Sequence, residues 1–257
     1  MRNVVVLGIA LLTLAGCSGK GGPNPSPTTF PETVLEPLDE LTWHGVDCAE
    51  LGLFIRAPAA GVRPFVHPDY TVVEAQGLAT VAVGLARCLS ATVLENVTNN
   101  LVMSDVGVFV EDPEGGSAPV FYQFWHASNR IATTENMSRV GLPTQEAPNS
   151  NFLTFGLVQA TLIESRISST EGPYSGAATG VPGSAAIPAR SFRWWHTSEN
   201  GTMYTDFTLT FKSAGPARGN VTAEAGSDLA KILGGTKVEG EGVYWTFDLG
   251  TNARRAD

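Results

Sequence analysis

Short segments in which apolar and polar residues alternate recur through most of the chain, and this pattern restricts its possible folds more than any other feature. Alternation with a period of two residues, bounded by Gly, Pro, Asn and Asp, is typical of β-strands. The segments that we expect to form strands are Thr71–Glu74, Leu78–Leu89, Leu101–Glu111, Val120–Ser128, Asn151–Ser168, Ser191–Ser198, Met203–Lys212, Val221–Ala225 and Val243–Leu249. They predict a mainly β fold of the β-rich α+β type, either a closed antiparallel β-barrel or a β-sandwich.

Turn and capping residues indicate how these segments are connected. Asn200-Gly201 favours a tight hairpin between its two flanking strands, because both residues readily adopt a positive φ. Thr134–Val140 and Ser227–Leu233 carry helix-capping residues, so the fold should include two or three short helices. Glu171–Ala189 is rich in Gly, Pro, Ala and Ser and is expected to be a long loop.

The N-terminus has the features of an export signal. Arg2 precedes a short apolar run at Val4–Leu12, which is too short to span a bilayer. The following Leu14-Ala15-Gly16-Cys17 resembles the lipobox of bacterial lipoproteins, in which the Cys is lipidated and becomes the mature N-terminus. The alternative is an ordinary signal peptide with an incidental Cys.

The lipobox resemblance implies a three-part chain. Residues 1–16 would be a signal peptide, residues 17–37 a lipidated Cys followed by a flexible tether of Gly, Pro, Ser and Thr, and residues 38–257 a single β-rich domain. Two or more acyl chains such as palmitate anchor a protein stably. We therefore expect a cell-envelope protein attached through Cys17 to the extracytoplasmic side of a membrane.

The net charge excludes one class of partner. The formal charge is −9, whereas nucleic-acid binding requires a basic surface. Nor does the sequence supply a polybasic segment that would hold an anionic membrane. Membrane attachment should thus depend on the lipid alone.

Two cysteines remain if Cys17 carries the lipid. Cys48 and Cys88 are an even pair, as expected of a disulfide in an oxidising compartment. Their bond would close a loop of about 40 residues and stabilise the fold by roughly 4 kcal/mol in the chain-entropy model. Two buried free thiols, or a metal site formed with a His, are the alternatives.

Three Trp-His pairs supply the candidate site residues. On a strand, Trp and the following His face opposite sides, so one member of each pair would face the interior of a barrel. The candidate ligand-binding or catalytic residues are His126, His196, Trp125, Trp195, Arg193 and His44. Three converging imidazoles can bind zinc, but the usual His-x-His and His-Glu-x-x-His spacings are absent, so we predict no metal and no other cofactor. A catalytic carboxylate pair could be drawn from Glu111, Asp105, Glu164 and Asp206, but no spacing selects one.

Two stretches are similar to acetoacetate-decarboxylase-like proteins. One runs from Gln123-Phe124-Trp125 through Asn129–Val140 to Gly141-Leu142-Pro143, and the other from Asp228–Gly235 through Val243–Gly250. This resemblance implies a closed β-barrel around a small internal cavity and, in the enzymes, a Schiff-base Lys with a lowered pKa. The chain departs from the family here, because its lysines are Lys20, Lys212, Lys231 and Lys237, none of them in the middle strands.

Together these features favour a lipid-anchored extracytoplasmic protein that binds a small ligand, either apolar or an organic acid, or an envelope partner. An enzyme with this fold but without the usual Lys chemistry is the main alternative, with a cavity built around His126, His196 and Arg193. A purely structural envelope protein is the third possibility.

Overall fold

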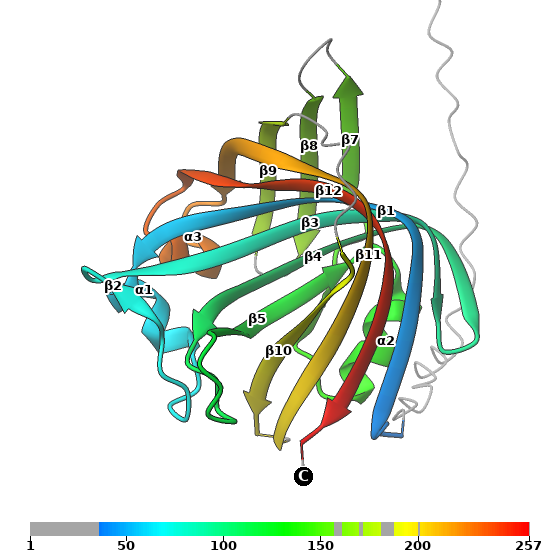
Figure 1. The fold of residues 1–257 in the computed structure, drawn as a ribbon, viewed down its shortest axis with the longest axis horizontal. Coiled ribbons are helices and arrows are strands. Elements are labelled where there is room, and N and C mark those ends of the chain that lie inside the picture. Colours follow the sequence, from blue (N-terminus) through cyan, green and yellow to red (C-terminus); the bar gives the residue numbers. More distant parts are fainter. Residues whose placement is uncertain (1–35, 157–160, 170–171, 181–187, 200, 257) are drawn as a thin grey trace, which may run out of the picture. The chain divides into compact units, whose positions relative to one another are not determined.

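The computed structural model describes residues 36–256 except 157–160, 170–171, 181–187 and 200 (Figure 1). The signal peptide, Cys17 and almost all of the tether therefore lie outside the described residues. The described strands are β1 (Glu40–Pro58), β2 (Glu74–Ala75), β3 (Leu78–Val93), β4 (Asn96–Val110), β5 (Val120–Ser128), β6 (Thr144–Glu146), β7 (Asn151–Gly156), β8 (Thr161–Ser169), β9 (Gly172–Gly180), β10 (Arg190–Ser198), β11 (Gly201–Ala223) and β12 (Lys237–Arg255). The described helices are α1 (Ala59–Val62), the 3-10 helix η1 (Arg63–Phe65), α2 (Ile131–Arg139) and α3 (Asp228–Leu233).

Seven strands close into a ring, which confirms the predicted β-rich fold as a barrel. Neighbours pair in the order β10-β5-β4-β3-β1-β12-β11, and β10 also pairs with β11. All of these pairs are antiparallel except β10–β5, where Trp194 lies opposite Phe121 and the strands run parallel. Closure leaves the strands of this ring paired on both sides.

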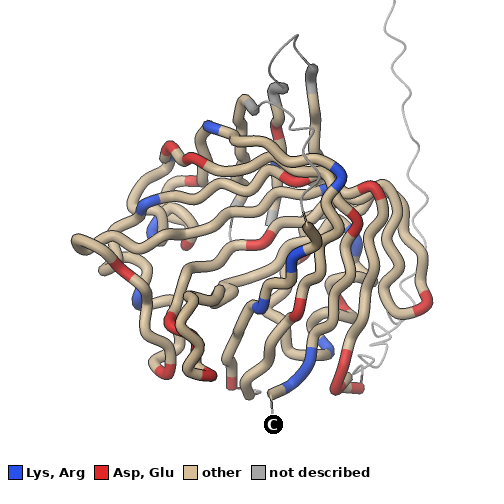
Figure 2. Tube along the Cα trace, in the orientation of Figure 1, with Lys and Arg blue, Asp and Glu red and all other residues tan. Residues whose placement is uncertain are grey.

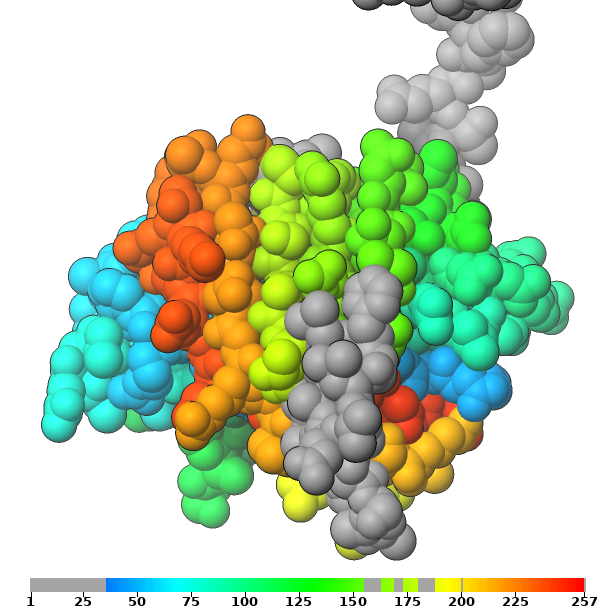
Figure 3. All heavy atoms as spheres, turned by 90° about the horizontal axis from the view of Figure 1, so that it is seen from above, coloured from blue at the N-terminus to red at the C-terminus, as the bar shows by residue number. Residues whose placement is uncertain are grey.

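A second layer continues from the far half of β11. This half pairs with β9, which lies beside the orange segment of β11 in Figure 3, and the layer continues from β9 to β8 and β7. Ile163, Ile167 and Tyr174 from this layer belong to the same buried cluster as Leu51 and Leu85 from the ring. The ring strand β3 is therefore covered on both faces, as its nearly continuous apolar sequence predicts.

The prediction that Glu171–Ala189 is a loop is wrong for the first half of this segment. Gly172–Gly180 forms β9, which is hydrogen-bonded to β8 on one side and to β11 on the other. Its small residues obscured the strand because they lack β-propensity. They are required by packing, since a Cβ on Gly176 would collide with the side chain of Leu85.

Several predicted strands differ in extent from the observed ones. Val221–Ala225 is mostly the end of β11, and Asn151–Ser168 covers both β7 and β8. The predicted return of Val120–Ser128 beside Leu101–Glu111 is confirmed by the β4–β5 pairing. The strand β11 is long because it pairs with β12 of the ring along most of its length and also with β9 of the second layer along its last part.

The predicted disulfide is confirmed. Cys48 on β1 lies directly opposite Cys88 on β3, and the two are bonded across the strands. Both sulfur atoms lie 2.7 Å from the position that a Cβ on Gly45 would occupy, so this site accommodates only glycine without rearrangement.

The helices cover parts of the barrel. Figure 1 shows α1 and α3 together on one side of the sheet and α2 on another. Met137 of α2 packs in one buried cluster with Leu41, Leu101 and Met203 from the ring strands, so α2 covers the part of the ring where these residues lie. The α3 prediction is confirmed with its cap, because the Ser227 Oγ accepts a hydrogen bond from the Ala230 amide at 3.2 Å. None of the described helices is long and apolar enough to span a bilayer.

Charged residues are interspersed along the strands. Figure 2 shows acidic and basic positions spread over the trace. Several ion pairs of the described residues join exposed side chains, such as Arg218 with Glu241. Such pairs contribute little to stability, so the more informative charges are the few that lie inside the ring.

Candidate functional site

A cavity of about 110 Å³ lies inside the ring of strands. Each of the seven ring strands contributes to its wall, so the cavity occupies the barrel interior. The residues that line it are Trp43, Glu50, Gly52, Phe54, Ala82, Val83, Gly84, Ala86, Met103, Asp105, Phe121, His126, Phe192, Trp194, Phe207, Leu209, Trp245, Phe247 and Leu249. A void of this order accommodates a small organic molecule, comparable with the cavities that bind benzene.

One wall of the cavity is a row of residues in register across four strands. Gly52 of β1 lies opposite Gly84 of β3, Gly84 opposite Asp105 of β4, and Asp105 opposite His126 of β5. Residues directly opposite each other in antiparallel strands point to the same face. The two glycines have no side chain to fill this part of the cavity, and the side chains of Asp105 and His126 line the cavity next to them.

Asp105 organises the polar end of this row. Its Oδ1 accepts a hydrogen bond from Gln123 Nε2 at 2.6 Å and lies 2.8 Å from His126 Nδ1. Because an ionised carboxylate only accepts hydrogen bonds, Nδ1 carries the proton and donates it. His126 is only 2% exposed, and among the described residues its Nε2 has no hydrogen-bond partner. Where the ring carries no second proton, Nε2 is an unused hydrogen-bond acceptor at the cavity wall.

A β-bulge brings Gln123 and His126 to the same carboxylate. Val106 pairs with Trp125 and Gly107 with Gln123, so Phe124 is an extra residue on β5. The bulge shifts the alternation of side chains by one position. Gln123 and His126, which are three residues apart, consequently face the same side.

Glu50 is the second carboxyl group of the cavity. Its Oε2 accepts a hydrogen bond from Trp245 Nε1 at 2.9 Å. Its Oε1 occupies the space left by Gly84, because a Cβ there would lie 2.7 Å from this oxygen. Burial raises the pKa of Glu50 to about 7, and the negative charge of Asp105 adds to this effect while the Trp245 hydrogen bond opposes it.

Aromatic rings form most of the remaining wall. Phe207 packs against Trp194 with ring centroids 4.9 Å apart and against the edge of Trp43 at 6.0 Å. Phe121 packs against Trp194 at 5.3 Å. These contacts hold the rings in place, so the cavity combines a rigid apolar wall with one polar end.

Comparison with solved structures identifies the fold of this chain. No protein-family model matches the sequence, and no curated protein matches it either. Among solved structures, an acetoacetate decarboxylase from Legionella pneumophila is similar, with a TM-score of 0.57 and 12% identity over 84% of this chain and 87% of that one. An acetoacetate-decarboxylase-like enzyme from Sphingomonas wittichii RW1 also gives a TM-score of 0.57 at 12% identity, over 85% of this chain and 92% of that one. The barrel has the acetoacetate-decarboxylase-like fold.

A third similar structure is the enduracididine biosynthesis enzyme MppR with bound HEPES, with a TM-score of 0.55 and 12% identity over 94% of this chain and 96% of that one. These identities establish a shared fold and leave the chemistry to be argued from the site itself. The lysine implied by the resemblance does not line the cavity in the described part of the chain. Lys212 pairs with Asp47 and Asp248 and is 40% exposed, and Lys231 pairs with Asp228 on α3.

The sequence-predicted site residues occupy different places. His126 lines the cavity, whereas Trp125, on the opposite face of β5, packs in the buried cluster of the second layer. His196 donates from Nδ1 to the Gln123 carbonyl at 3.0 Å, and burial lowers its pKa. Trp195 packs against Tyr204 at 5.4 Å, and His44 is exposed. The three histidines do not form a common site, and the described residues include no group of His, Cys, Asp or Glu arranged to hold a metal ion.

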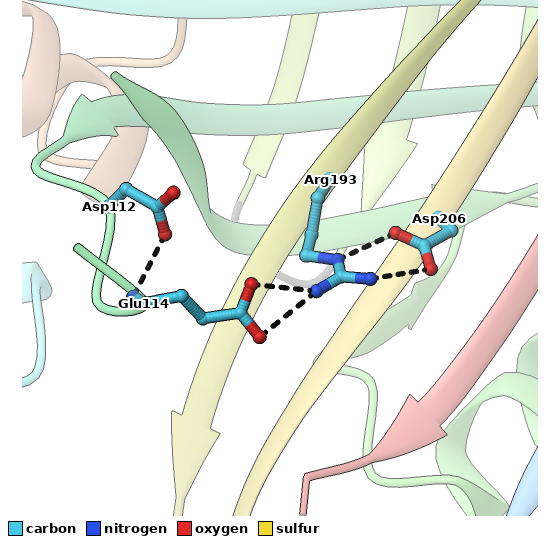
Figure 4. A network of polar contacts seen from close by, with 4 residues as sticks. All are labelled: Asp112, Glu114, Arg193 and Asp206. Atoms are coloured by element: carbon cyan, nitrogen blue, oxygen red, sulfur yellow. Dashed lines mark hydrogen bonds and ion pairs between the residues drawn. The ribbon is translucent and has the colours of Figure 1, made fainter. Parts of the chain in front are cut away.

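Arg193 takes part in an ion-pair network away from the cavity wall. Its guanidinium binds Asp206 through two hydrogen bonds at 2.7 and 3.0 Å and both carboxylate oxygens of Glu114 at 3.0 and 3.1 Å (Figure 4). Its Cζ also lies 4.2 Å from the ring centroid of Tyr204. Arg193 therefore links the turn after β4 to β10 and β11. Its neighbours Phe192 and Trp194 face the cavity instead.

Four residues that line the cavity were not among the candidates predicted from the sequence, namely Glu50, Trp43, Trp245 and Asp105. Glu50 stands between Ala49 and Leu51, where alternation alone reads it as the outward residue of a half-buried strand. The one available signal was its position in an otherwise apolar segment, where a carboxyl group without a charged neighbour is costly to bury.

Proposed function

We propose that this chain is a lipid-anchored extracytoplasmic protein whose barrel interior binds a small, mainly apolar ligand. The observation that carries the proposal is the cavity inside the ring, with its aromatic wall and a single polar end formed by Glu50, Asp105 and His126. Ligand sites are typically concave and mostly apolar, with few polar groups that fix orientation. The raised pKa of Glu50 also fits a functional site, since such shifts concentrate there.

The tryptophans provide a test with a built-in control. Trp43, Trp194 and Trp245 line the cavity, whereas Trp125 and Trp195 do not. We expect small molecules of about six non-hydrogen atoms, neutral, anionic and cationic, to include binders that shift the indole N–H signals of the first three in NMR spectra. Shifts restricted to the other two, or none at saturating concentration, would refute binding in the cavity.

A cavity-filling variant completes this test. Ala82→Leu places a larger side chain at the cavity wall and should abolish the indole shifts. Val97→Leu is the matched control, because Val97 is 69% exposed on β4. Equal shifts in the two variants would show that the ligand binds elsewhere.

The anchor is supported by the sequence Leu14-Ala15-Gly16-Cys17, and the disulfide is consistent with an oxidising compartment. Mass spectrometry of the mature protein should find Cys17 at the N-terminus with a diacylglyceryl group on its sulfur. An unmodified N-terminus at another residue would rule out this form of attachment.

A second candidate function is general acid–base catalysis without a lysine. It is favoured by the Asp105–His126 pair, which leaves His126 Nε2 facing the same cavity as Glu50. A neutral imidazole oriented by a carboxylate is a typical general base. Deuterium incorporation from D₂O into small ketones, followed by NMR, should then require His126, and rates unchanged in His126→Gln would eliminate this candidate.

A further inference from the structure

The acidic side chains that line the cavity have no basic Lys or Arg partner within the described residues. Within the described residues, the wall contains the carboxyl groups of Glu50 and Asp105 and the imidazole of His126, and it contains neither lysine nor arginine. A bound carboxylate would therefore meet two groups of its own charge in a region of low dielectric constant. This arrangement disfavours the organic-acid ligand that the sequence allowed, most strongly above the pKa of Glu50, which is about 7.

The polar end also offers oxygen and nitrogen atoms that, within the described residues, accept no hydrogen bond. The contacts of Asp105 with Gln123 and His126 both end on Oδ1, so within the described residues they leave Oδ2 without a hydrogen bond. The Oε2 atom of Glu50 accepts a hydrogen bond from Trp245 Nε1, and its Oε1 lies in the space above Gly84. The His126 Nε2 is buried and without a partner among the described residues. An ammonium group, which has only N–H donors, matches such a set.

The aromatic wall fits the same chemistry. The faces of aromatic rings carry partial negative charge and attract cations within about 6 Å, most strongly for Trp. Three of the five tryptophans line this cavity, together with Phe121, Phe192 and Phe207. Carboxyl groups at one end and aromatic faces around the sides both favour a positively charged occupant.

We propose that the cavity selects a small organic cation, a primary or secondary ammonium group on a short apolar body. The ammonium group would lie between Glu50, Asp105 and His126, and the apolar body would pack against Trp43, Trp194 and the neighbouring phenylalanines. This inference rests on the proposed function, since it names the ligand class of the same cavity. It assigns to this barrel a charge preference opposite to that of a site for an anionic acid.

Three probes of the same length test it. Butylamine, 1-butanol and butyrate are similar in size and differ in charge, and each is titrated into the full chain in detergent at about pH 8, where Glu50 is mostly ionised. Binding is followed by the indole signals of Trp43, Trp194 and Trp245. We expect butylamine to bind at least about tenfold more tightly than 1-butanol, and butyrate to bind most weakly.

The outcomes separate the two proposals. If 1-butanol or butyrate binds as tightly as butylamine, the cation inference is overturned and the proposed ligand-binding function stands. If none of the three binds, both are overturned. Selective binding of butylamine supports both.

Variants identify the groups that confer selectivity. Glu50→Gln keeps the size of the side chain and should weaken butylamine binding by about tenfold and 1-butanol binding by clearly less, because only butylamine loses an ion pair. Glu241→Gln is the matched control, because Glu241 is 78% exposed and pairs with Arg218 on the outer surface. If Glu50→Gln weakens both probes equally, Glu50 shapes the cavity without selecting charge, and the proposal fails.

Discussion

The clearest energetic consequence of the site is that Glu50 makes the stability of the fold depend on pH. Burial raises its pKa from 4.5 to about 7, with a further contribution from the nearby charge of Asp105. The folded state therefore binds the Glu50 proton more tightly than the unfolded state does. Stability from this proton is fully present below pH 4.5 and is lost as the pH rises through about 7.

The size of this effect follows from the pKa span. Each pKa unit corresponds to about 1.4 kcal/mol, so ionisation of Glu50 should cost the folded state up to about 3 kcal/mol. Glu50→Gln removes the titration and keeps an oxygen that can accept from Trp245. The variant should match the wild type near pH 4.5 and exceed its free energy of unfolding by up to about 3 kcal/mol near pH 8.

Urea unfolding measured across this pH range, with the disulfide intact, provides the assay. The difference between the wild type and Glu50→Gln reports on this carboxyl group, because the two proteins are identical at every other residue. Glu241→Gln, at the exposed surface, should show no pH-dependent difference. A difference between Glu50→Gln and the wild type that stays constant with pH would refute the reasoning.

Three further changes test the framework around the site, each by urea unfolding. Replacing both Cys48 and Cys88 by Ser opens a loop of 40 residues and should lower the free energy of unfolding by about 4 kcal/mol, whereas an effect below about 1 kcal/mol would contradict a structural role for the bond. Arg193→Ala should cost about 1–2 kcal/mol through its ion pairs and aromatic contact, more than Arg218→Ala at the fully exposed pair. Ser227→Ala removes the cap of α3 and should cost about 1 kcal/mol, an effect that Ser227→Asp should largely avoid.

Much of the barrel could be predicted because local patterns decide it. Leu101–Glu111 and Val120–Ser128 alternate around a Gly-rich turn, and they pair as expected. The opposite orientation of Trp125 and His126 also follows from the strand period alone. These features depend on neighbouring residues and a nearby turn, so the sequence is sufficient to specify them.

The site could not be predicted in the same way because it depends on long-range register. Asp105 meets His126 through the β4–β5 pairing, and the bulge at Phe124 adds Gln123 to the same oxygen. Trp245 meets Glu50 from a strand 195 residues further along the chain. Periodicity assigns each side chain to a face but does not select its partners, and a single bulge reverses the assignment.

Under the proposed function, Glu50 would link the stability of the barrel to the occupancy of its cavity. An ionised Glu50 is costly in the empty site because, within the described residues, no lysine or arginine lines the cavity to compensate its charge. A bound ammonium group would supply that charge, and so it would lower the pKa of Glu50 and release its proton. By linkage, the affinity for such a ligand should increase as the pH rises toward the pKa of the free site and level off above it. The high pH that destabilises the ligand-free barrel is therefore also the pH at which a bound cation should stabilise it most. Both effects have one cause, the buried negative charge of Glu50, which only the ligand neutralises within the described residues.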